Sequence, residues 1–229
     1  DCRELSLLLH GTTTTTNALL EKKIAKCGLI TTKGFRDVLE LGRRTRPNAY
    51  GLLGSFEPLI SREYRLEVDE RMDADGNVVT ALDEDGVARA AQSLVEMGCE
   101  SLVIHFLHAY ANDAHEIRAA EIAAEVWPNE HITYGSAILA EFREYERGVA
   151  AAVNASIQPV LSRYLARLRD ELTTAGYDRD LLVMQGNGGT VSSSIVAQSA
   201  INTVMSGPAS GVMAAAYTGA RSGFDTIVT

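Results

Sequence analysis

The sequence predicts an α/β fold. Short apolar runs alternate along the chain with segments of helical periodicity, and the links between them are short. Glycine-rich turns follow several of these runs directly. The 229 residues are 46% hydrophobic and 22% charged, which is the balance of a globular protein with a sizeable core. This length fits one large domain or two modest ones.

The chain begins with a predicted strand, a glycine turn and a helix. Residues 5–9 form a mostly apolar run, which indicates a buried strand that ends at His10-Gly11. Threonines 12–16 and Asn17 precede good helix formers, and Thr or Asn in that place indicates a helix start. Further strands are expected at residues 27–32, 101–107 and 131–135, and a short helix at 35–41.

Local patterns also predict how some elements face. Apolar Tyr64, Leu66 and Val68 alternate with polar residues, which is typical of a half-exposed strand. The turn signal at residues 75–77 predicts a β-hairpin. Two helix starts are expected, at Asp83 and at the capping box formed by Asp113 and Glu116; the second helix should turn Ile117, Ala120 and Ala124 inward.

Residues 141–174 keep a helical apolar spacing over an unusual length. Pro159 lies inside this segment, so a kink or two abutting helices are expected there. We expect a domain boundary within it, which divides the chain into residues 1–152 and 153–229. Beyond it, the sequence predicts a strand at 181–185, an alanine-rich helix at 212–220 and a further strand at 226–229.

Charge and cysteine content exclude several classes of protein. A formal net charge of −9 argues against non-specific binding to nucleic acid or to an anionic membrane. The three cysteines are widely spaced and form no CxxC pair, so neither a disulfide framework nor a structural zinc site is predicted. No run approaches the roughly 18 apolar residues of a membrane helix, and no signal peptide is visible. A cytoplasmic protein is expected.

Three glycine- and threonine-rich segments follow predicted strands and could carry chemistry. Glycine lets the backbone approach a ligand closely, and N–H groups at a helix start favour an anion. Singly, each segment is more often only a turn; together they favour a nucleotide or small-anion site, although none has P-loop or dinucleotide-fingerprint spacing. The candidates are His10, Gly11, Thr12, Thr13 and Asn17; Gln185, Asn187, Gly188 and Gly189; and Ser206, Gly207 and Pro208, the last suited to a first helical turn.

Other candidates are weaker. His105, His108 and His115 lie close in sequence, but metal ligands must converge in space, so hydrogen-bonded histidines are favoured and no metal site is predicted. His108 remains a candidate for the substrate side of the site. Arg46 belongs to a basic cluster that is either a solvated loop or an anion contact, and Arg36 is a further candidate of this kind.

Six ordered segments resemble the hydantoinase A/5-oxoprolinase family. The string His10-Gly-Thr-Thr-Thr-Thr-Thr-Asn17-Ala-Leu-Leu-Glu21 is similar to that family's HGTT…TNALLE segment. The match extends over essentially the whole chain, and Gly186 stands where the family more often has Ser. The other five segments are Thr31-Thr-Lys-Gly-Phe-Arg-Asp37 with Arg46-Pro47, Leu107-His108-Ala-Tyr-Ala-Asn112 with His115-Glu116, Glu144-Tyr-Glu-Arg147, Met184-Gln-Gly-Asn-Gly-Gly189 and Ser206-Gly-Pro-Ala209.

This resemblance implies part of an actin-like, sugar-kinase-type (ribonuclease H-like) ATPase fold, with two lobes around a nucleotide cleft. It implies ATP and Mg²⁺ as cofactors of the full-length protein, in which ATP would phosphorylate an amide or enolate oxygen. The implied substrate is a small cyclic amide such as a hydantoin or 5-oxoproline. The implied partner is a hydantoinase B-type subunit or domain, and a homo-oligomer is left open.

Two alternative functions stay open: a subunit of an ATP-dependent ketone carboxylase, and a non-catalytic binding or assembly module. Relatives in this family usually carry an Asp-x-Gly-Gly-Thr-type phosphate loop near the start and another after a strand like residues 226–229, and neither is found in this sequence. We therefore expect the isolated chain to be inactive and to hold no tightly bound cofactor, and we assign no catalytic residue.

Overall fold

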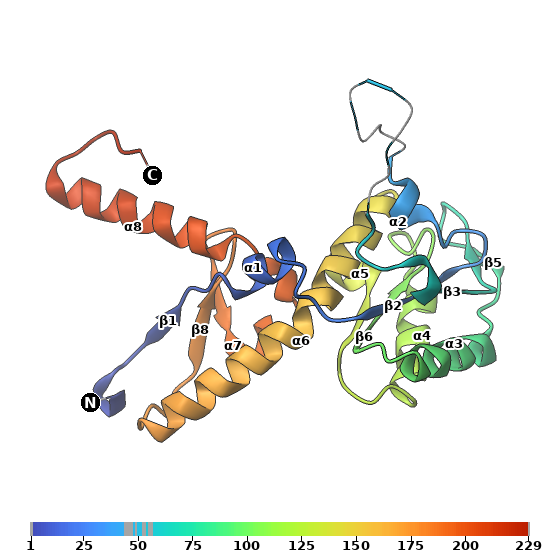
Figure 1. Ribbon diagram of the computed structural model, residues 1–229, viewed down its shortest axis with the longest axis horizontal. Helices are drawn as coiled ribbons and strands as arrows, with labels where there is room; N and C mark the ends of the chain where they lie inside the picture. Colours follow the sequence, from blue (N-terminus) through green and yellow to red (C-terminus); the bar gives the residue numbers. More distant parts are fainter. Residues whose placement is uncertain (1, 44–47, 49, 52–53, 55–56, 229) are drawn as a thin grey trace. The chain divides into compact units, whose positions relative to one another are not determined.

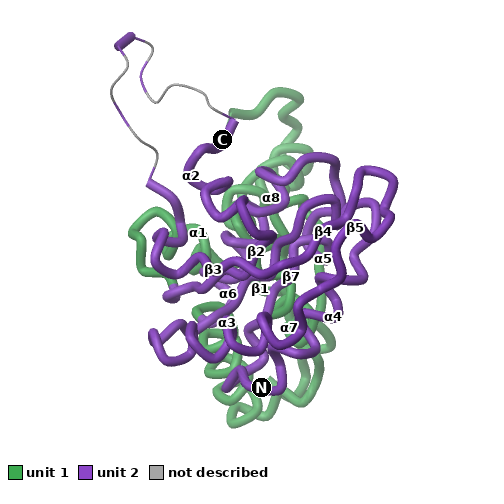
Figure 2. Tube along the Cα trace, turned by 90° about the vertical axis from the view of Figure 1, so that its right-hand side faces the viewer, with its two compact units in different colours: residues 1–24, 160–229 green, residues 25–159 purple. Residues whose placement is uncertain are grey.

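The computed structural model describes residues 2–43, 48, 50–51, 54 and 57–228 (Figure 1). The chain forms two compact units: unit 1 comprises Asp1–Ile24 with Val160–Thr229, and unit 2 comprises Ala25–Pro159 (Figure 2). Helix α6 (Glu144–Thr174) belongs to both units, because the boundary between them falls inside it. The boundary predicted between residues 152 and 153 separates two regions of the sequence, not these compact units, and it stays a prediction.

Unit 2 is built on a parallel sheet of four strands in the order β3-β2-β6-β7. Every residue of the two central strands is buried, as expected for a parallel sheet covered on both faces. The predicted strands are confirmed, although β6 ends at His105, two residues before the predicted end at residue 107. Their bounds are β2 (Cys27–Thr32), β3 (Arg65–Val68), β6 (Ser101–His105) and β7 (Ile132–Tyr134).

Helices cover both faces of this sheet, and each face has its own apolar core. Because side chains alternate across a strand, Leu29 and Ile30 of β2 enter different cores. Ile30 packs in the cluster that contains Leu94 of α3, and Leu29 packs in the cluster that contains Ala152 of α6. The helices of unit 2 besides α6 are α2 (Val38–Leu41), the 3-10 turn η2 (Arg62–Tyr64), α3 (Glu84–Glu96), α4 (Ala114–Ala124) and α5 (Gly135–Ile138).

Two local predictions in unit 2 are confirmed. Strands β4 (Arg71–Met72) and β5 (Val78–Thr80) pair antiparallel as the expected hairpin. Asp83 caps α3, because its Oδ1 accepts a hydrogen bond from the Gly86 N–H at 2.9 Å.

The alternation predicted for β3 is wrong in one respect. Arg65 is fully buried, while Leu66 is only half-buried and Val68 is buried as expected. The guanidinium donates to the Ile60 carbonyl oxygen at 2.8 Å and reaches two carboxylates, so its charge is compensated inside the protein.

The stripe by which α4 meets the core also differs from the prediction. Asp113 makes no side-chain capping bond, and Glu116 is fully buried. The Glu116 carboxylate accepts the backbone N–H groups of Phe106 at 2.8 Å and Ser136 at 2.7 Å. No capping box forms, because tertiary donors have taken the carboxylate. The buried stripe is Glu116, Ala119, Ile122 and Ala123. Of the predicted residues, Ala120 packs against the core while partly buried, and Ile117 and Ala124 are exposed.

Unit 1 contains a smaller sheet of three strands in the order β1-β8-β9. Strand β1 (Leu8–His10) pairs parallel to β8 (Leu181–Met184), so that His10 lies opposite Val183. Strand β9 (Thr190–Ser192) returns antiparallel to β8 and was not predicted. The helical elements are η1 (Cys2–Glu4), α1 (Thr14–Leu20), α7 (Ser193–Val196), η3 (Ala200–Thr203), α8 (Ser206–Ser222) and the second half of α6.

Several expectations for unit 1 are wrong. Residues 5–9 do not form a buried strand, because β1 begins at Leu8 and Leu7 and Leu9 are 62% and 50% exposed. Residues 226–228 form no strand, and residue 229 lies outside the described part of the chain. Helix α8 begins six residues before the predicted start at 212, so the third glycine-rich segment is its first turn. At the boundary of the two units, Pro159 lies within one continuous α6, so the alternative of two abutting helices is wrong, while the expected kink stays a prediction.

No helix in the described part of the chain combines the length and the apolar character needed to cross a membrane.

Candidate functional site

The three glycine- and threonine-rich segments, residues 10–17, 185–189 and 206–208, all belong to unit 1. The first and the third are joined directly by hydrogen bonds. The buried Ser206 hydroxyl donates to the Thr12 carbonyl oxygen at 2.9 Å, and the Met205 N–H donates to Thr16 Oγ1 at 3.0 Å. The start of α8 is therefore fastened to the start of α1.

Glycines allow this close approach. A Cβ atom added to Gly207 would lie 2.7 Å from Thr13 Cγ2, and one added to Gly11 would lie 3.1 Å from Ser210 Oγ. Distances below 3.0 Å between such atoms require movement, so a side chain at position 207 would push the two segments apart. At these positions glycine is needed for space and not for a left-handed backbone.

The second segment is the turn between β8 and β9. The turn is closed by hydrogen bonds from the Gln185 N–H to the Gly189 carbonyl oxygen at 2.8 Å and from the Gly188 N–H to Gln185 at 3.0 Å. Gly188 adopts φ +83°, a backbone conformation that favours glycine. Asn187 supports the same turn, because its Oδ1 accepts the Gly189 N–H at 2.8 Å. The four candidate residues of this segment thus form one tight turn.

Residues 200–204 link this turn to the other two segments. The Gly186 N–H donates to the Asn202 carbonyl oxygen at 2.7 Å, and the Thr203 hydroxyl lies 2.9 Å from that of Thr15 in α1. Met205 then adopts φ +64° and leads into α8. The structure therefore brings all three predicted segments together within unit 1.

The chemistry of this cluster suits an anion. Pro208 lies in the first turn of α8, as predicted, and a helix of this length presents partial positive charge at its N-terminal end. Thr12 and Thr13 add hydroxyl groups close to that end, whereas the buried Ser206 hydroxyl is occupied by the Thr12 carbonyl oxygen. The three segments contain no Asp or Glu, so they offer phosphate oxygens N–H and O–H groups but offer Mg²⁺ no carboxylate ligand.

His10 ends β1 and comes immediately before the Gly11-Thr12 turn. Its Nε2 lies 2.7 Å from the Tyr164 hydroxyl of α6, and the two rings are 5.7 Å apart with 31° between their planes. Burial lowers the pKa of His10, which favours the uncharged imidazole at neutral pH. Tyr164 was not predicted as a site residue. The available signal was a hydroxyl beside the buried Leu161 and Leu165, since a half-buried tyrosine usually bonds through its hydroxyl.

Asn17 contributes only a local contact. Its side-chain N–H donates to Thr13 Oγ1 one helical turn earlier, at 3.3 Å. This contact stays within the first segment.

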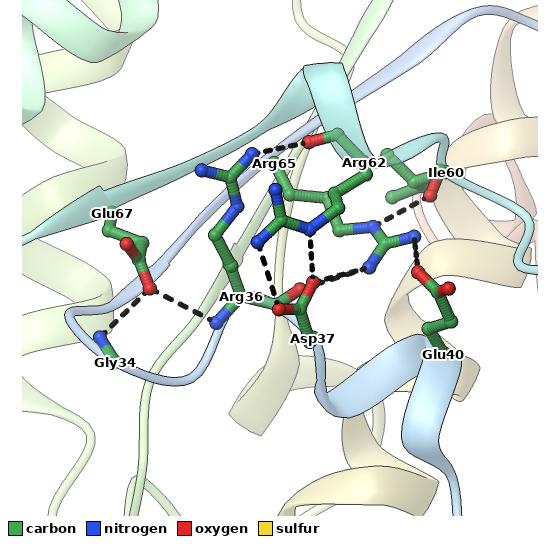
Figure 3. A network of polar contacts seen from close by, with 8 residues as sticks. All are labelled: Gly34, Arg36, Asp37, Glu40, Ile60, Arg62, Arg65 and Glu67. Carbon is green, nitrogen blue, oxygen red and sulfur yellow. Dashed lines mark hydrogen bonds and ion pairs between the residues drawn. The ribbon is translucent and has the colours of Figure 1, made fainter.

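The weaker candidate Arg36 lies in unit 2, in a network of charged residues (Figure 3). Its Nη2 donates to the Arg62 carbonyl oxygen at 2.9 Å, and its backbone N–H donates to Glu67. Asp37 accepts a bidentate contact from Arg62 and a longer one from the buried Arg65. The hydrogen bond from Arg62 is the largest effect that lowers the pKa of Asp37. This network, which also includes Glu40, fastens the segment 34–40 to β3.

His108 also lies in unit 2, just beyond the end of β6. It is half-buried with φ +58°, a strained conformation for a residue other than glycine, and its Nδ1 lies 3.4 Å from the Tyr110 hydroxyl. His108 and Arg36 belong to unit 2, whereas the three segments belong to unit 1. Arg46 lies outside the described residues.

His105 and His115 contact separate carboxylates in unit 2. His115 Nδ1 lies 2.9 Å from Glu70, and His105 Nδ1 lies 3.7 Å from Glu116. Burial by itself raises the pKa of Glu116, but His105 and the N–H groups of Phe106 and Ser136 outweigh it and hold that pKa below its ordinary value. Among the described residues, no group of three or more His, Cys, Asp or Glu side chains could hold a metal ion.

Comparison with known proteins gives the chain a family. Residues 1–127 match the model of the hydantoinase/oxoprolinase N-terminal region, and residues 147–229 match the hydantoinase/oxoprolinase model. An uncharacterized protein of Methanocaldococcus jannaschii is 39% identical over 220 residues, which are 93% of this chain and 32% of that protein. The alpha subunit of caprolactamase from Pseudomonas jessenii is 29% identical over 100% of this chain and 33% of its own length.

Solved structures agree with this assignment. A nucleotide-free structure of acetone carboxylase, described as ATP-dependent, matches 97% of this chain and 33% of its own with a TM-score of 0.83 and 26% identity. The ATP-dependent caprolactamase of Pseudomonas jessenii matches 91% of this chain and 31% of its own, with a TM-score of 0.80 and 28% identity. The chain spans about a third of the length of these relatives. The fold class predicted from the sequence is confirmed, and the chain belongs to the hydantoinase/oxoprolinase family.

Proposed function

We propose that unit 1 supplies part of a phosphate-binding wall in an ATP-dependent enzyme that opens a cyclic amide. The observation that carries this proposal is the joining of residues 10–17, 185–189 and 206–208 around the first turn of α8. Similarity to an ATP-dependent caprolactamase supports the cyclic amide as the substrate class.

In this proposal ATP supplies a phosphoryl group that turns an amide oxygen into part of a good leaving group. The residues of the chain bind and orient that group. The first turn of α8 offers backbone N–H groups, and Thr12 and Thr13 offer hydroxyls. The turn 185–189 supports this wall, because its own N–H groups at Gln185, Gly186, Gly188 and Gly189 already donate within the protein. Mg²⁺ does not fit these segments as a side-chain ligand set, because they carry no carboxylate. We assign it no step.

A second candidate function is a ketone carboxylase. The similarity to acetone carboxylase favours it, because that structure matches nearly the whole chain. The same wall would then bind the phosphate of an activated enolate or of the carboxyl donor. Only turnover can separate the two reactions, since they share the phosphoryl step.

We also propose a partner and a compartment. The caprolactamase relative is named as an alpha subunit, which supports assembly with a second, hydantoinase B-type polypeptide or domain. The three free cysteines, two of them buried, support a reducing cytoplasmic location.

The test measures ATP turnover by the native protein that contains this chain. Hydantoin, 5-oxoproline and caprolactam are compared with acetone or acetophenone plus bicarbonate. A ring-opened product with ADP release supports the amidohydrolase, and a carboxylated product with ADP release supports the second candidate. No ATP turnover with any of these substrates rejects both.

A matched pair of glycine variants ties turnover to the wall. Gly207→Ala places a methyl group 2.7 Å from Thr13 Cγ2, whereas Gly211→Ala, in the same helix, meets nothing within 4 Å. We expect G207A to lower kcat/KM about 10- to 100-fold, the range for a small misplacement in a site. G211A should stay within about twofold, as for an ordinary surface substitution. Equal activities in the two variants would contradict the proposal.

A further inference from the structure

Two tyrosines fasten strand β1, and they do so in different ways. The Tyr177 hydroxyl accepts the backbone N–H of Leu8 at 3.1 Å and donates to the Asp180 carbonyl oxygen at 3.0 Å. Tyr177 thus holds the strand itself. The Tyr164 hydroxyl contacts the ring of His10 at 2.7 Å. Tyr164 therefore acts on a side chain, and that side chain belongs to the first glycine-rich segment.

The chemistry of the pair decides which group donates. A phenol O–H is a better proton donor than a neutral imidazole N–H, and an imidazole nitrogen is a better acceptor than a phenol oxygen. A separation of 2.7 Å is that of a strong hydrogen bond from a hydroxyl. Donation by Tyr164 to Nε2 leaves the ring proton on Nδ1, because the nitrogen of the hydrogen-bond acceptor carries no proton.

The surroundings of His10 favour its neutral form. On β8 the residue opposite is Val183, which carries no charge, and α6 supplies Tyr164 as the titratable contact. Burial lowers the pKa of His10, which favours the neutral imidazole at pH 7. A neutral ring has two tautomers, and a directed hydrogen bond to one nitrogen selects between them.

We propose that Tyr164 is a positioning residue that holds His10 as the neutral tautomer with its proton on Nδ1. His10 then brings an uncharged N–H donor of fixed orientation to the phosphate-binding wall. The role in binding rests on the proposed function, whereas the tautomer is a property of the chain alone. A fixed neutral donor can bind a phosphoryl oxygen without the change of charge that a titrating imidazolium would bring.

The test is nuclear magnetic resonance of the ¹⁵N-labelled 229-residue chain. Long-range ¹H–¹⁵N spectra of imidazole rings distinguish the two neutral tautomers, and His10→Gln identifies the His10 signals among the five histidines. In the wild type we expect an unprotonated Nε2 and a protonated Nδ1. In Tyr164→Phe both tautomers should appear, and the pKa of His10 should rise, because a hydrogen bond to the neutral form has been lost.

The matched control is Tyr177→Phe, which loosens β1 at Leu8 and leaves the His10 contact in place. It should keep the wild-type tautomer and pKa of His10. If Y177F changes His10 as much as Y164F does, the effect is a general loosening of β1 and the proposal fails. A fall in the His10 pKa in Y164F would mean that Nε2–H donates, which also overturns it.

The outcome does not depend on a well-folded variant or on turnover. A protonated Nε2 in the wild-type spectrum refutes the proposal even if Y164F is unfolded. These spectra need no nucleotide, so a native protein that never turns over ATP would reject the proposed function and leave the tautomer result standing. If both hold, Y164F should lower kcat/KM of the native protein about fivefold, the equivalent of one net hydrogen bond, and Y177F should lower it less.

Discussion

The two units of the chain differ in what they bury. Among the described residues, two apolar core clusters lie in unit 2, together with fully buried charged residues such as Arg65 and Glu116. Unit 1 has a three-stranded sheet with a solvent-exposed edge strand, and α8 buries only Ser206 and Gly219 along its length. The three glycine- and threonine-rich segments all lie in unit 1.

The contrast separates residues that hold the fold from residues that present ligand groups. Binding residues are commonly carried on loops and helix ends that a rigid scaffold positions. Substitutions in the buried network of unit 2 should therefore act on the free energy of unfolding. Substitutions in the segments of unit 1 should act more on binding, with smaller effects on stability.

The largest effect is expected for Arg65→Ala. Arg65 is fully buried, and its loss removes donors from the Ile60 carbonyl oxygen and from Glu40. The carboxylate partners are partly exposed, so the cost comes from the cavity and from the Ile60 carbonyl oxygen left without its donor, and it should be about 3 kcal/mol of unfolding free energy. Chemical denaturation followed by circular dichroism measures it.

Arg62→Ala is the control for this variant. Arg62 shares Asp37 with Arg65, but its side chain is 56% exposed, so its removal should cost less than about 1 kcal/mol. Similar losses in R65A and R62A would show that burial does not separate the two arginines.

An intermediate effect is expected for Glu116→Gln. A glutamine amide has one oxygen, so it cannot accept the N–H groups of both Phe106 and Ser136 as the carboxylate does. An unsatisfied buried donor costs about 2 kcal/mol. Denaturation at pH 7 measures the difference between this variant and the wild type.

The same pair predicts a pH dependence. The pKa of Glu116 is lowered in the folded chain, so its contribution is present above the ordinary carboxyl pKa of about 4.3 and is lost as the pH falls through the folded pKa. The stability difference between wild type and E116Q should therefore be largest near pH 7 and shrink below about pH 4. A difference that grows in acid would refute this account.

The smallest effect is expected in unit 1, for Ser206→Ala. The Ser206 hydroxyl donates to the Thr12 carbonyl oxygen, and its loss should cost about 1 kcal/mol. Ser210→Ala is the control, because the Ser210 hydroxyl bonds only to the preceding turn of its own helix. Hydrogen exchange should quicken for residues 12–17 in S206A and stay unchanged in β2 and β6 for both variants. Faster hydrogen exchange throughout both units in S206A would contradict the conclusion that substitutions in the unit 1 segments leave the core of unit 2 unaffected.

The elements that sequence predicts best are those whose environment is uniform. Strands β2 and β6 are buried on both faces, so an unbroken apolar run identifies them. Arg65 and Glu116 were misjudged because alternation and capping rules place charged side chains in water or on a nearby backbone group. Each instead found partners from other elements, such as the Ser136 N–H, which is 20 residues from Glu116. Local patterns contain no information about such partners.

The sequence predicted which segments form the candidate site, but it did not predict how these segments are arranged in space. Glycine and threonine content marked all three segments, because the backbone conformations and hydroxyl groups involved are local properties. The parallel pairing of β1 with β8 is not local, and neither is the contact between Tyr164 and His10, which are 154 residues apart. On a helix of apolar spacing, Tyr164 has the pattern of an ordinary core residue.

The close packing of the α1 and α8 starts has a consequence for how the family can vary. Gly11 faces Ser210, and Gly207 faces Thr13, so each side contributes one bare backbone position and one hydroxyl-bearing residue to a reciprocal pair of contacts. A side chain at Gly207 requires Thr13 to move or to become smaller, and one at Gly11 requires a smaller shift of Ser210. Among related sequences we therefore expect residues 11 and 210 to change together, and residues 13 and 207 to change together. Almost the entire chain separates the two members of each pair.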